Sequence, residues 1–191
     1  MTEVSAKEVL GYFKRKEIAL SKINIEEIIS LFQILKKASE NNSRVFIAGN
    51  GGSASTAEHF VADLGIGSHI RGARNTIDAH CLNSNIAVIT ALSNDTSYDY
   101  VFSKQLELLS PTPSDVVIVI SASGNSSNIL NLLEMARSLR LTSCALIGFD
   151  GGRARVLADF VVHVPTEFHE YGVVEDLHLS ICHLVTELLR K

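Results

Sequence analysis

Residues 115–127 read DVVIVISASGNSS, an apolar run that changes abruptly into a segment rich in serine and glycine. A continuous Val/Ile run of this length is typical of a strand that is buried on both faces of a sheet. Residues 44–53, RVFIAGNGGS, repeat the pattern with a Gly-rich segment after the apolar run. Two such units, separated by helical stretches, predict a parallel sheet with both loops at equivalent strand ends, where α/β folds bind ligands.

The rest of the chain alternates between helical and strand patterns. Apolar residues recur at helical intervals over residues 4–40, as one helix or as two with a break near 21–24, and this segment packs on the domain or on a second subunit. We therefore expect an α/β fold, a doubly wound parallel sheet in a single domain over 1–191. Further strands are predicted at 143–148 and 160–164, helices at 58–64, 100–109, 128–139, 153–158 and 174–191, and either element at 87–91.

Composition restricts the class of protein. Of the 191 residues 46% are hydrophobic, which is enough for a large core, and the net charge of −4 argues against a general nucleic-acid binder. The N-terminus lacks the apolar core of a signal peptide, and no apolar run is long enough to cross a membrane. Three scattered cysteines, Cys81, Cys144 and Cys182, favour the reducing cytoplasm.

Both loops are candidate phosphate sites. Residues 49–53 lack the lysine of a Walker motif, but glycines admit a ligand to the backbone, and a following helix N-terminus favours an anion. An ordinary strand-to-helix turn is the alternative. The hydroxyls of Ser121, Ser123 and Ser126 can bind phosphate oxygens, although a serine-rich loop by itself more often caps a helix. Two such loops at equivalent strand ends favour joint phosphate binding.

Two helical segments carry titratable side chains. His59 and Asp63 are four residues apart and share one helical face, as a solvated surface pair also would. The last predicted helix carries Glu175, His178 and His183. A lone helical histidine is more often structural than a ligand, so these residues by themselves leave their role open.

The motifs also carry a family resemblance. GNGGS, followed about 70 residues later by SASGNS, resembles the SIS (sugar isomerase) domain family. Within it, AGNGGSASTAEHF, ALSNDTSYDYVFSKQL, IGFDGG and VEDLHLSICH resemble the phosphoheptose isomerases. The resemblance implies a flavodoxin-like fold and a homotetramer with active sites between subunits. It also implies conversion of sedoheptulose 7-phosphate into a heptose 7-phosphate for surface polysaccharides such as lipopolysaccharide or capsule.

The resemblance assigns candidate site residues. It implies a Zn²⁺ site at His59, Asp63, Glu175 and His183, where Asp63 replaces the family's Glu and Glu175 replaces its Gln. The extra carboxylate favours a divalent cation. The arginine usual after the carboxylate has no clear match, and Arg71 or Arg74 could serve. We expect Asp63 and His183 to transfer protons, and the following residues to bind substrate: Asn50, Gly51, Gly52, Ser53, Asp95, Ser121, Ser123, Ser126 and Glu175.

Two alternatives remain at this stage. Some relatives bind a replication initiator or sense phosphosugars without catalysis, and the initiator-associating type resembles this chain overall but lacks the histidine that His183 supplies here. Other SIS enzymes, such as arabinose or hexulose phosphate isomerases, fit GNGGS with HFVAD less well. An isomerase with a sugar-phosphate substrate, and with no nucleic-acid or membrane partner, is therefore the favoured hypothesis.

Overall fold

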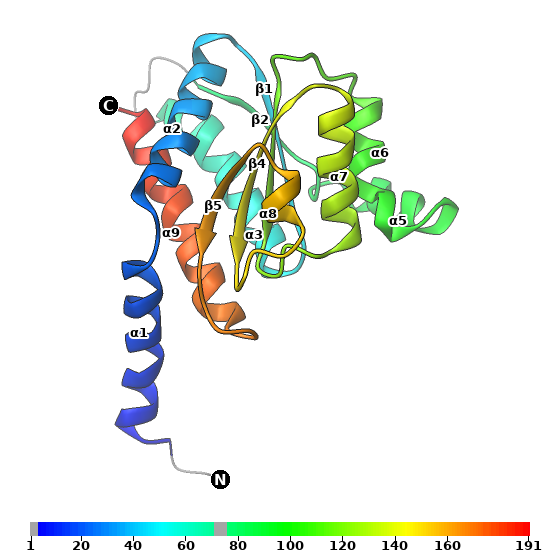
Figure 1. Ribbon diagram of the computed structural model, residues 1–191. Helices are drawn as coiled ribbons and strands as arrows, with labels where there is room; N and C mark the ends of the chain where they lie inside the picture. The colour runs from blue at the N-terminus through cyan, green and yellow to red at the C-terminus, as the bar shows by residue number, and fades with distance from the viewer. Residues whose placement is uncertain (1–3, 71–75) are drawn as a thin grey trace.

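The computed structural model describes residues 4–70 and 76–191, and within these ranges five parallel strands form one sheet in the order β2-β1-β3-β4-β5 (Figure 1). From β1 the chain moves to the edge strand β2, and then crosses to β3 on the other side of β1. The connections therefore reverse direction between β1 and β3, which is the point where open α/β sheets bind ligands. The strands are β1 (Arg44–Gly49), β2 (Asp78–Cys81), β3 (Val116–Ser121), β4 (Thr142–Gly148) and β5 (Phe160–Val164).

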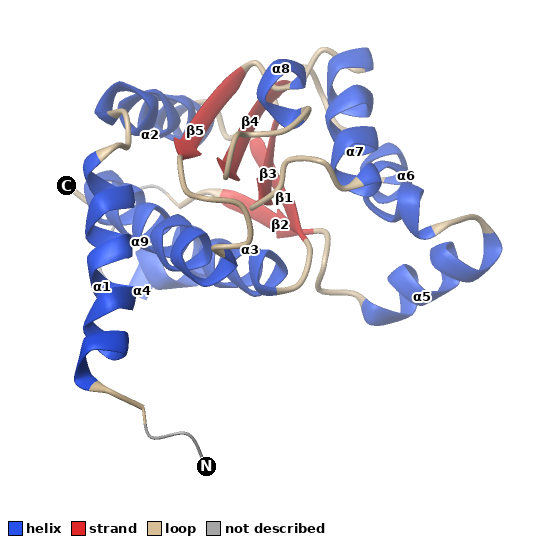
Figure 2. Cartoon of the chain, turned by 60° about the horizontal axis from the view of Figure 1, so that its bottom comes forward, coloured by secondary structure: helices blue, strands red, loops and turns tan. Residues whose placement is uncertain are grey.

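Helices cover both faces of the sheet, as Figure 2 shows. One face is covered by α2 (Ile25–Glu40), α3 (Gly52–Ala62) and α9 (Tyr171–Leu189), and the other by α6 (Val101–Leu108), α7 (Ser127–Ser138) and α8 (Ala154–Leu157). No helix in the described ranges is long and apolar enough to cross a membrane. The other helical segments are α1 (Ala6–Ser21), the π-helix Asp63–Gly67, α4 (Ser68–Ile70), α5 (Ile86–Asp95) and the 3-10 helix Tyr98–Tyr100.

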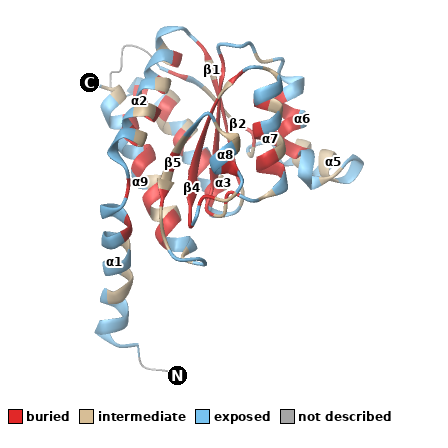
Figure 3. Ribbon diagram, viewed as in Figure 1, coloured by how far each residue is buried: buried red, intermediate tan, exposed pale blue. Residues whose placement is uncertain are grey.

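The buried strand β3 divides its side chains between two hydrophobic cores. Ile118 and Ile120 pack in the core with α2, α3 and α9, while Val117 and Val119 pack in the core with α6 and α7. Alternate side chains of a strand point to opposite faces, so a strand buried on both faces must be apolar at every position. The red strands at the centre of Figure 3 show this double burial, and they confirm the doubly wound prediction.

The N-terminal segment forms two helices with the expected break between them. Asn24 ends the break, because its side chain accepts a hydrogen bond of 3.0 Å from the backbone N–H of Glu26 and so caps α2. Helix α2 packs on β5 and α9, whereas α1 extends past the domain beside the first turns of α9 (Figure 1). Tyr12 Oη and Lys16 Nζ lie 2.8 Å and 3.1 Å from Asp176 Oδ2, which ties α1 to α9.

Two elements, β2 and α3, differ from the sequence prediction, and a third, α5, decides between its two alternatives. Strand β2 is not predicted, because its four residues, DAHC, are too few and too polar for a strand signal. Helix α3 begins at Gly52, six residues before the predicted start, since its first turn consists of glycine, serine and alanine. Residues 87–91, predicted as either element, belong to α5, which projects from the domain and buries none of its residues (Figures 1 and 3).

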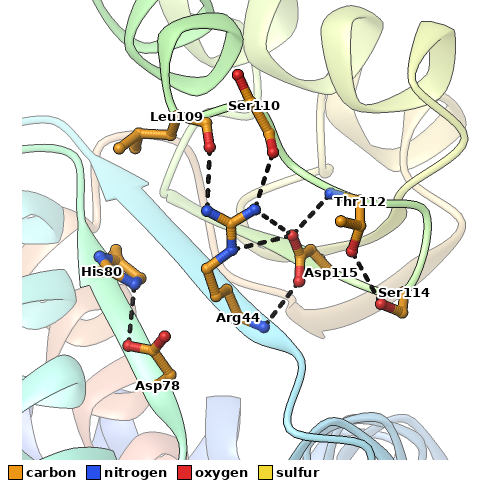
Figure 4. Close-up of polar contacts among 8 residues, drawn as sticks. All are labelled: Arg44, Asp78, His80, Leu109, Ser110, Thr112, Ser114 and Asp115. Atoms are coloured by element: carbon orange, nitrogen blue, oxygen red, sulfur yellow. Dashed lines mark hydrogen bonds and ion pairs between the residues drawn. The ribbon is translucent and has the colours of Figure 1, made fainter.

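A buried ion pair joins the two central strands at the edge opposite the loops (Figure 4). Asp115, only 3% exposed, accepts hydrogen bonds from the backbone N–H groups of Arg44 and Thr112, both at 2.8 Å, and from Arg44 Nη2 at 2.8 Å. Burial acts to raise the pKa of Asp115, but these hydrogen bonds and the guanidinium charge together outweigh it and lower the pKa. The carboxylate is therefore favoured in the folded protein.

We expect Asp115→Asn to lower the free energy of unfolding by about 1–3 kcal/mol at neutral pH, because two backbone donors and one guanidinium lose a charged acceptor. A lowered folded pKa stabilises above the unfolded pKa, and this contribution is lost as pH falls through the folded pKa. The difference between wild type and variant in urea denaturation should therefore shrink from about pH 5 downward. Asp99→Asn, at an exposed carboxylate, is the control. An equal difference at acid and neutral pH would contradict this account.

Candidate functional site

The first loop, residues 49–53, connects β1 to α3. Asn83 holds Gly49 on both sides: Asn83 Oδ1 accepts from the Gly49 N–H at 3.1 Å, and Asn83 Nδ2 donates to the Gly49 carbonyl at 2.8 Å. Gly51, at φ +57°, is the N-cap of α3 in a backbone conformation that favours glycine. Side-chain capping is absent there, but the Ser53 and Ala54 N–H groups donate to the Asn50 and Gly51 carbonyls, both at 3.0 Å, so Gly52 supplies the N–H group of this turn that is left for an anion.

The second loop, residues 121–127, connects β3 to α7 and is held from below by the IGFDGG segment. Gly124, at φ +61°, donates its N–H to Ser121 Oγ at 3.1 Å and accepts from the Ala154 N–H at 2.9 Å. A Cβ at Gly124 would collide with the Gly151 carbonyl, and a Cβ at Gly152 would collide with the Ser123 carbonyl. The glycines of IGFDGG therefore let the two loops pack backbone to backbone.

The two loops together line a cavity of about 310 Å³ with the start of α9. The lining residues, all within the described ranges, include neither lysine nor arginine, so serine hydroxyls and backbone N–H groups are the available donors. This cavity unites eight residues that the sequence analysis assigned to substrate binding and adds Tyr171, which no motif indicated. The eight are Asn50, Gly51, Gly52, Ser53, Ser121, Ser123, Ser126 and Glu175.

Glu175 lies against the first turn of α3. A Cβ at Gly52 would collide with the Glu175 carboxyl group, so glycine is required for this approach. Burial raises the pKa of Glu175, and the neighbouring charge of Asp176 raises it further. The carboxyl group lies beside Gly52, at the N-terminal and positive end of the α3 dipole, in the cavity that an anion would enter.

An amide pair joins the two loops across the cavity. Asn50 Nδ2 donates to Asn128 Oδ1 at 2.9 Å, and Asn128 Nδ2 donates back to Asn50 Oδ1 at 3.0 Å. Tyr98 Oη also donates to Asn50 Oδ1, at 2.9 Å. Neither Asn128 nor Tyr98 was identified from the sequence, because the pairing crosses 78 and 48 residues of chain. Asp95 does not line the cavity; it is exposed, and it accepts from Asn94 Nδ2 at 2.8 Å.

A second cavity, of about 290 Å³, contains His59, Asp63 and His183. His59 Nε2 and His183 Nε2 lie 3.1 Å apart, and Asp63 Oδ2 lies 3.5 Å from the first and 3.8 Å from the second. One ligand atom from each of the three residues fits within 4.8 Å of the others. Two imidazole nitrogens and a carboxylate in this arrangement suit a divalent metal such as Zn²⁺.

The two cavities lie along one seam between α3 and α9. Gly52 faces Glu175, His59 faces His183, and Asp63 faces Arg190, so the two helices run in the same direction. Gly52 and His59 are seven residues apart, or about 10 Å along a helix. Glu175 belongs to the first cavity and is not part of the His59–Asp63–His183 cluster.

Three other residues named from the sequence lie outside both cavities or outside the described residues. His178 is fully buried, and burial lowers its pKa to about 4, so it is neutral at physiological pH and structural. Arg71 and Arg74, suggested as substitutes for the family's arginine, lie outside the described residues.

The chain is similar to known proteins of one family. A family model described as "SIS domain" matches residues 11–148. The chain is 34% identical over 178 residues to a protein named "Probable phosphoheptose isomerase" from Thermoplasma acidophilum, covering 93% of this chain and 95% of that one. It is 34% identical over 185 residues to a phosphoheptose isomerase from Helicobacter pylori, covering 97% and 93%. The solved structure of phosphoheptose isomerase GmhA from Neisseria gonorrhoeae superposes with a TM-score of 0.84 at 27% identity, covering 96% and 95%.

We expect Gly124→Ala to destabilise the second loop and weaken phosphate binding. The left-handed backbone alone costs about 1–2 kcal/mol with a Cβ, and the collision with the Gly151 carbonyl adds to it. Melting temperature, measured with and without phosphate, should fall and lose its phosphate-dependent rise. Gly11→Ala, within α1, is the control and should be neutral or stabilising. A Gly124→Ala protein that keeps both values would show that the loop tolerates the side chain.

Proposed function

We propose, from the premise that the chain belongs to the SIS domain family and to its phosphoheptose isomerases, that it interconverts sedoheptulose 7-phosphate and D-glycero-D-manno-heptose 7-phosphate. The protein is thus an isomerase, and its product would supply heptose for surface polysaccharides. The observation that carries the proposal is the common seam of α3 and α9, which places an anion cavity and a His–Asp–His cluster about 10 Å apart. That separation suits a sugar chain whose phosphate and carbonyl lie at opposite ends.

The first cavity would hold the phosphate. Ser53, Ser121, Ser123 and Ser126 supply hydroxyls, and Gly52 supplies a backbone N–H group at the start of α3. Binding of this non-reacting end orients C1 and C2 at the cluster, so that binding energy is used to place the reacting carbons. Burial raises the pKa of Glu175, which favours protonation of this carboxyl group beside a phosphate.

Isomerisation needs a proton moved between C1 and C2. A base removes a proton from C1 of the ketose while the C2 carbonyl oxygen gains one, which gives an enediol. Delivery of a proton to C2 and loss of the O1 proton then give the aldose. We assign Asp63 and His183 as the proton-transferring pair, because they face one another beside His59 and both are accessible from the second cavity.

The cluster fits a resident metal. The two Nε2 atoms at 3.1 Å can share only one proton between them when both rings are neutral, and a cation facing both nitrogens and the carboxylate would satisfy all three groups. His59, Asp63 and His183 would hold Zn²⁺, which would polarise the substrate carbonyl. The proton transfers assigned to Asp63 and His183 refer to the site without the ion, because an imidazole nitrogen bound to a metal cannot accept a proton. The family resemblance assigns Glu175 as a fourth ligand, and Glu175 lies in the neighbouring first cavity, outside the His59–Asp63–His183 cluster.

Assembly and location form the remaining part of the proposal. Helix α1 leaves large apolar side chains exposed beyond the domain, and a second copy of the chain could cover them in a homotetramer. These side chains include Val9, Leu10, Phe13 and Leu20, which are 51%, 66%, 59% and 56% exposed. The three cysteines are free in the described structure, and we place the enzyme in the cytoplasm.

We expect His183→Ala to abolish turnover of sedoheptulose 7-phosphate, while phosphate still raises the melting temperature because the first cavity is separate from His183. Formation of the aldoheptose 7-phosphate can be followed by NMR of the anomeric protons. His69→Ala, at an exposed histidine of α4 that lines neither cavity, is the matched control. Undiminished turnover by the His183→Ala protein would exclude the assigned role.

We expect wild-type protein to bind one Zn²⁺ per chain in calorimetric titration, and His59→Ala to weaken this binding by about 100-fold or more, because a direct ligand is lost. Chelation should remove the ion and lower the melting temperature. The His69→Ala protein should titrate like wild type. Equal Zn²⁺ affinity in the His59→Ala and wild-type proteins would place the ion elsewhere.

A further inference from the structure

The C-cap residue of α9, Arg190, brings a cation into the histidine cavity. Arg190 lines this cavity together with His59, Asp63, His183 and Glu187, and its side chain is 16% exposed. Arg190 Nη2 lies 3.7 Å from Asp63 Oδ1 and 3.5 Å from the Asp63 carbonyl oxygen. Arg190 Nε lies 3.5 Å from Ser68 Oγ. No sequence motif indicated this residue, because its partner lies 127 residues earlier in the chain.

The local backbone makes room for the guanidinium group. Asp63 opens a π-helical turn, Asp63–Gly67, and Ser68 Oγ closes it with a 2.7 Å hydrogen bond to the Asp63 carbonyl. A Cβ at Gly67 would lie 3.2 Å from Asp63 Oδ1 and 3.6 Å from Arg190 Nη2. A larger side chain there would point toward the same two groups, so glycine leaves this space to Arg190. Single π-turns inserted in helices often occur at functional sites.

The two oxygens of the Asp63 carboxylate therefore face different groups. Oδ2 faces the Nε2 atoms of His59 and His183, while Oδ1 faces Arg190. A carboxylate held at one oxygen presents its other oxygen in a fixed direction. We propose that Arg190 is a positioning residue that orients Asp63 toward the histidine pair and balances its charge. The proposal deepens the proposed function, on which its kinetic readout rests.

A simpler role for Arg190 is stabilisation of the helix end, because cations near a C-terminus interact favourably with the helix dipole. Lys191 allows the two roles to be separated. It follows Arg190 directly, carries the same charge, and pairs with Glu187 Oε1 at 3.7 Å, but its side chain is 69% exposed. Arg190→Gln and Lys191→Gln each remove one positive charge from the same turn, and only the first removes a contact with Asp63.

The experiment compares wild type, Arg190→Gln, Arg190→Lys and Lys191→Gln. We expect Arg190→Gln to lower kcat by about 10–100-fold with KM for sedoheptulose 7-phosphate nearly unchanged, because the phosphate cavity is not touched. Zn²⁺ affinity should fall by about 10-fold or more. Arg190→Lys should recover part of both losses, and Lys191→Gln should match wild type. The ¹⁵N-imidazole NMR signals of His59 and His183 should shift in the Arg190→Gln protein and stay in place in the Lys191→Gln protein.

Equal values of kcat, Zn²⁺ affinity and imidazole spectra in the two glutamine variants would overturn the proposal and leave Arg190 as a helix-end cation. Failure of the proposed function is recognised separately, as absence of wild-type turnover. In that case the role of Arg190 is tested by the Zn²⁺ titration. If wild type binds no Zn²⁺, the role is tested by the imidazole spectra, because a shift of the His59 and His183 signals confined to the Arg190→Gln protein requires neither substrate nor metal.

Discussion

The parallel packing of α3 against α9 is the constraint on which the rest of the site depends. Gly52 admits the Glu175 carboxyl group to the start of α3, because a Cβ there would displace that side chain. The two helices then stay in register from the phosphate loop, past His59 and His183, to Asp63 and Arg190. Each pair of facing residues adds one chemical group to a single groove: an anion cradle, a histidine pair and an oriented carboxylate.

The sheet topology explains why the first cavity lies at the carboxyl ends of the strands. Between β1 and β3 the connections diverge to opposite sides, which opens a crevice that neither connection covers. Both loops of the crevice are held by neighbouring segments. Asn83 hydrogen-bonds to Gly49 of the first loop, and the backbone at Gly151 and Gly152 packs closely against the second loop. A preorganised cradle of N–H and hydroxyl donors can bind phosphate without a lysine, since no donor has to be ordered on binding.

Two carboxyl groups, Asp63 and Glu175, differ in their electrostatic surroundings. The guanidinium group that approaches Asp63 belongs to the opposite end of the chain, at Arg190. Glu175 adds a carboxyl group beside the anion cradle, where burial raises its pKa and favours its protonation.

The sequence by itself determined the buried strands, the two loops that follow β1 and β3, and the positions of His59, Asp63 and His183. These signals are local: apolar runs, glycine and serine after a strand, and helical spacing. It did not determine strand β2, the Asn50–Asn128 pair, the separation of Glu175 from the histidine cluster, the place of Asp95 outside the cavity, or the approach of Arg190 to Asp63. Each of these depends on how segments far apart in the chain pack together, and the packing of α3 against α9 decides the contacts of Glu175 and Arg190.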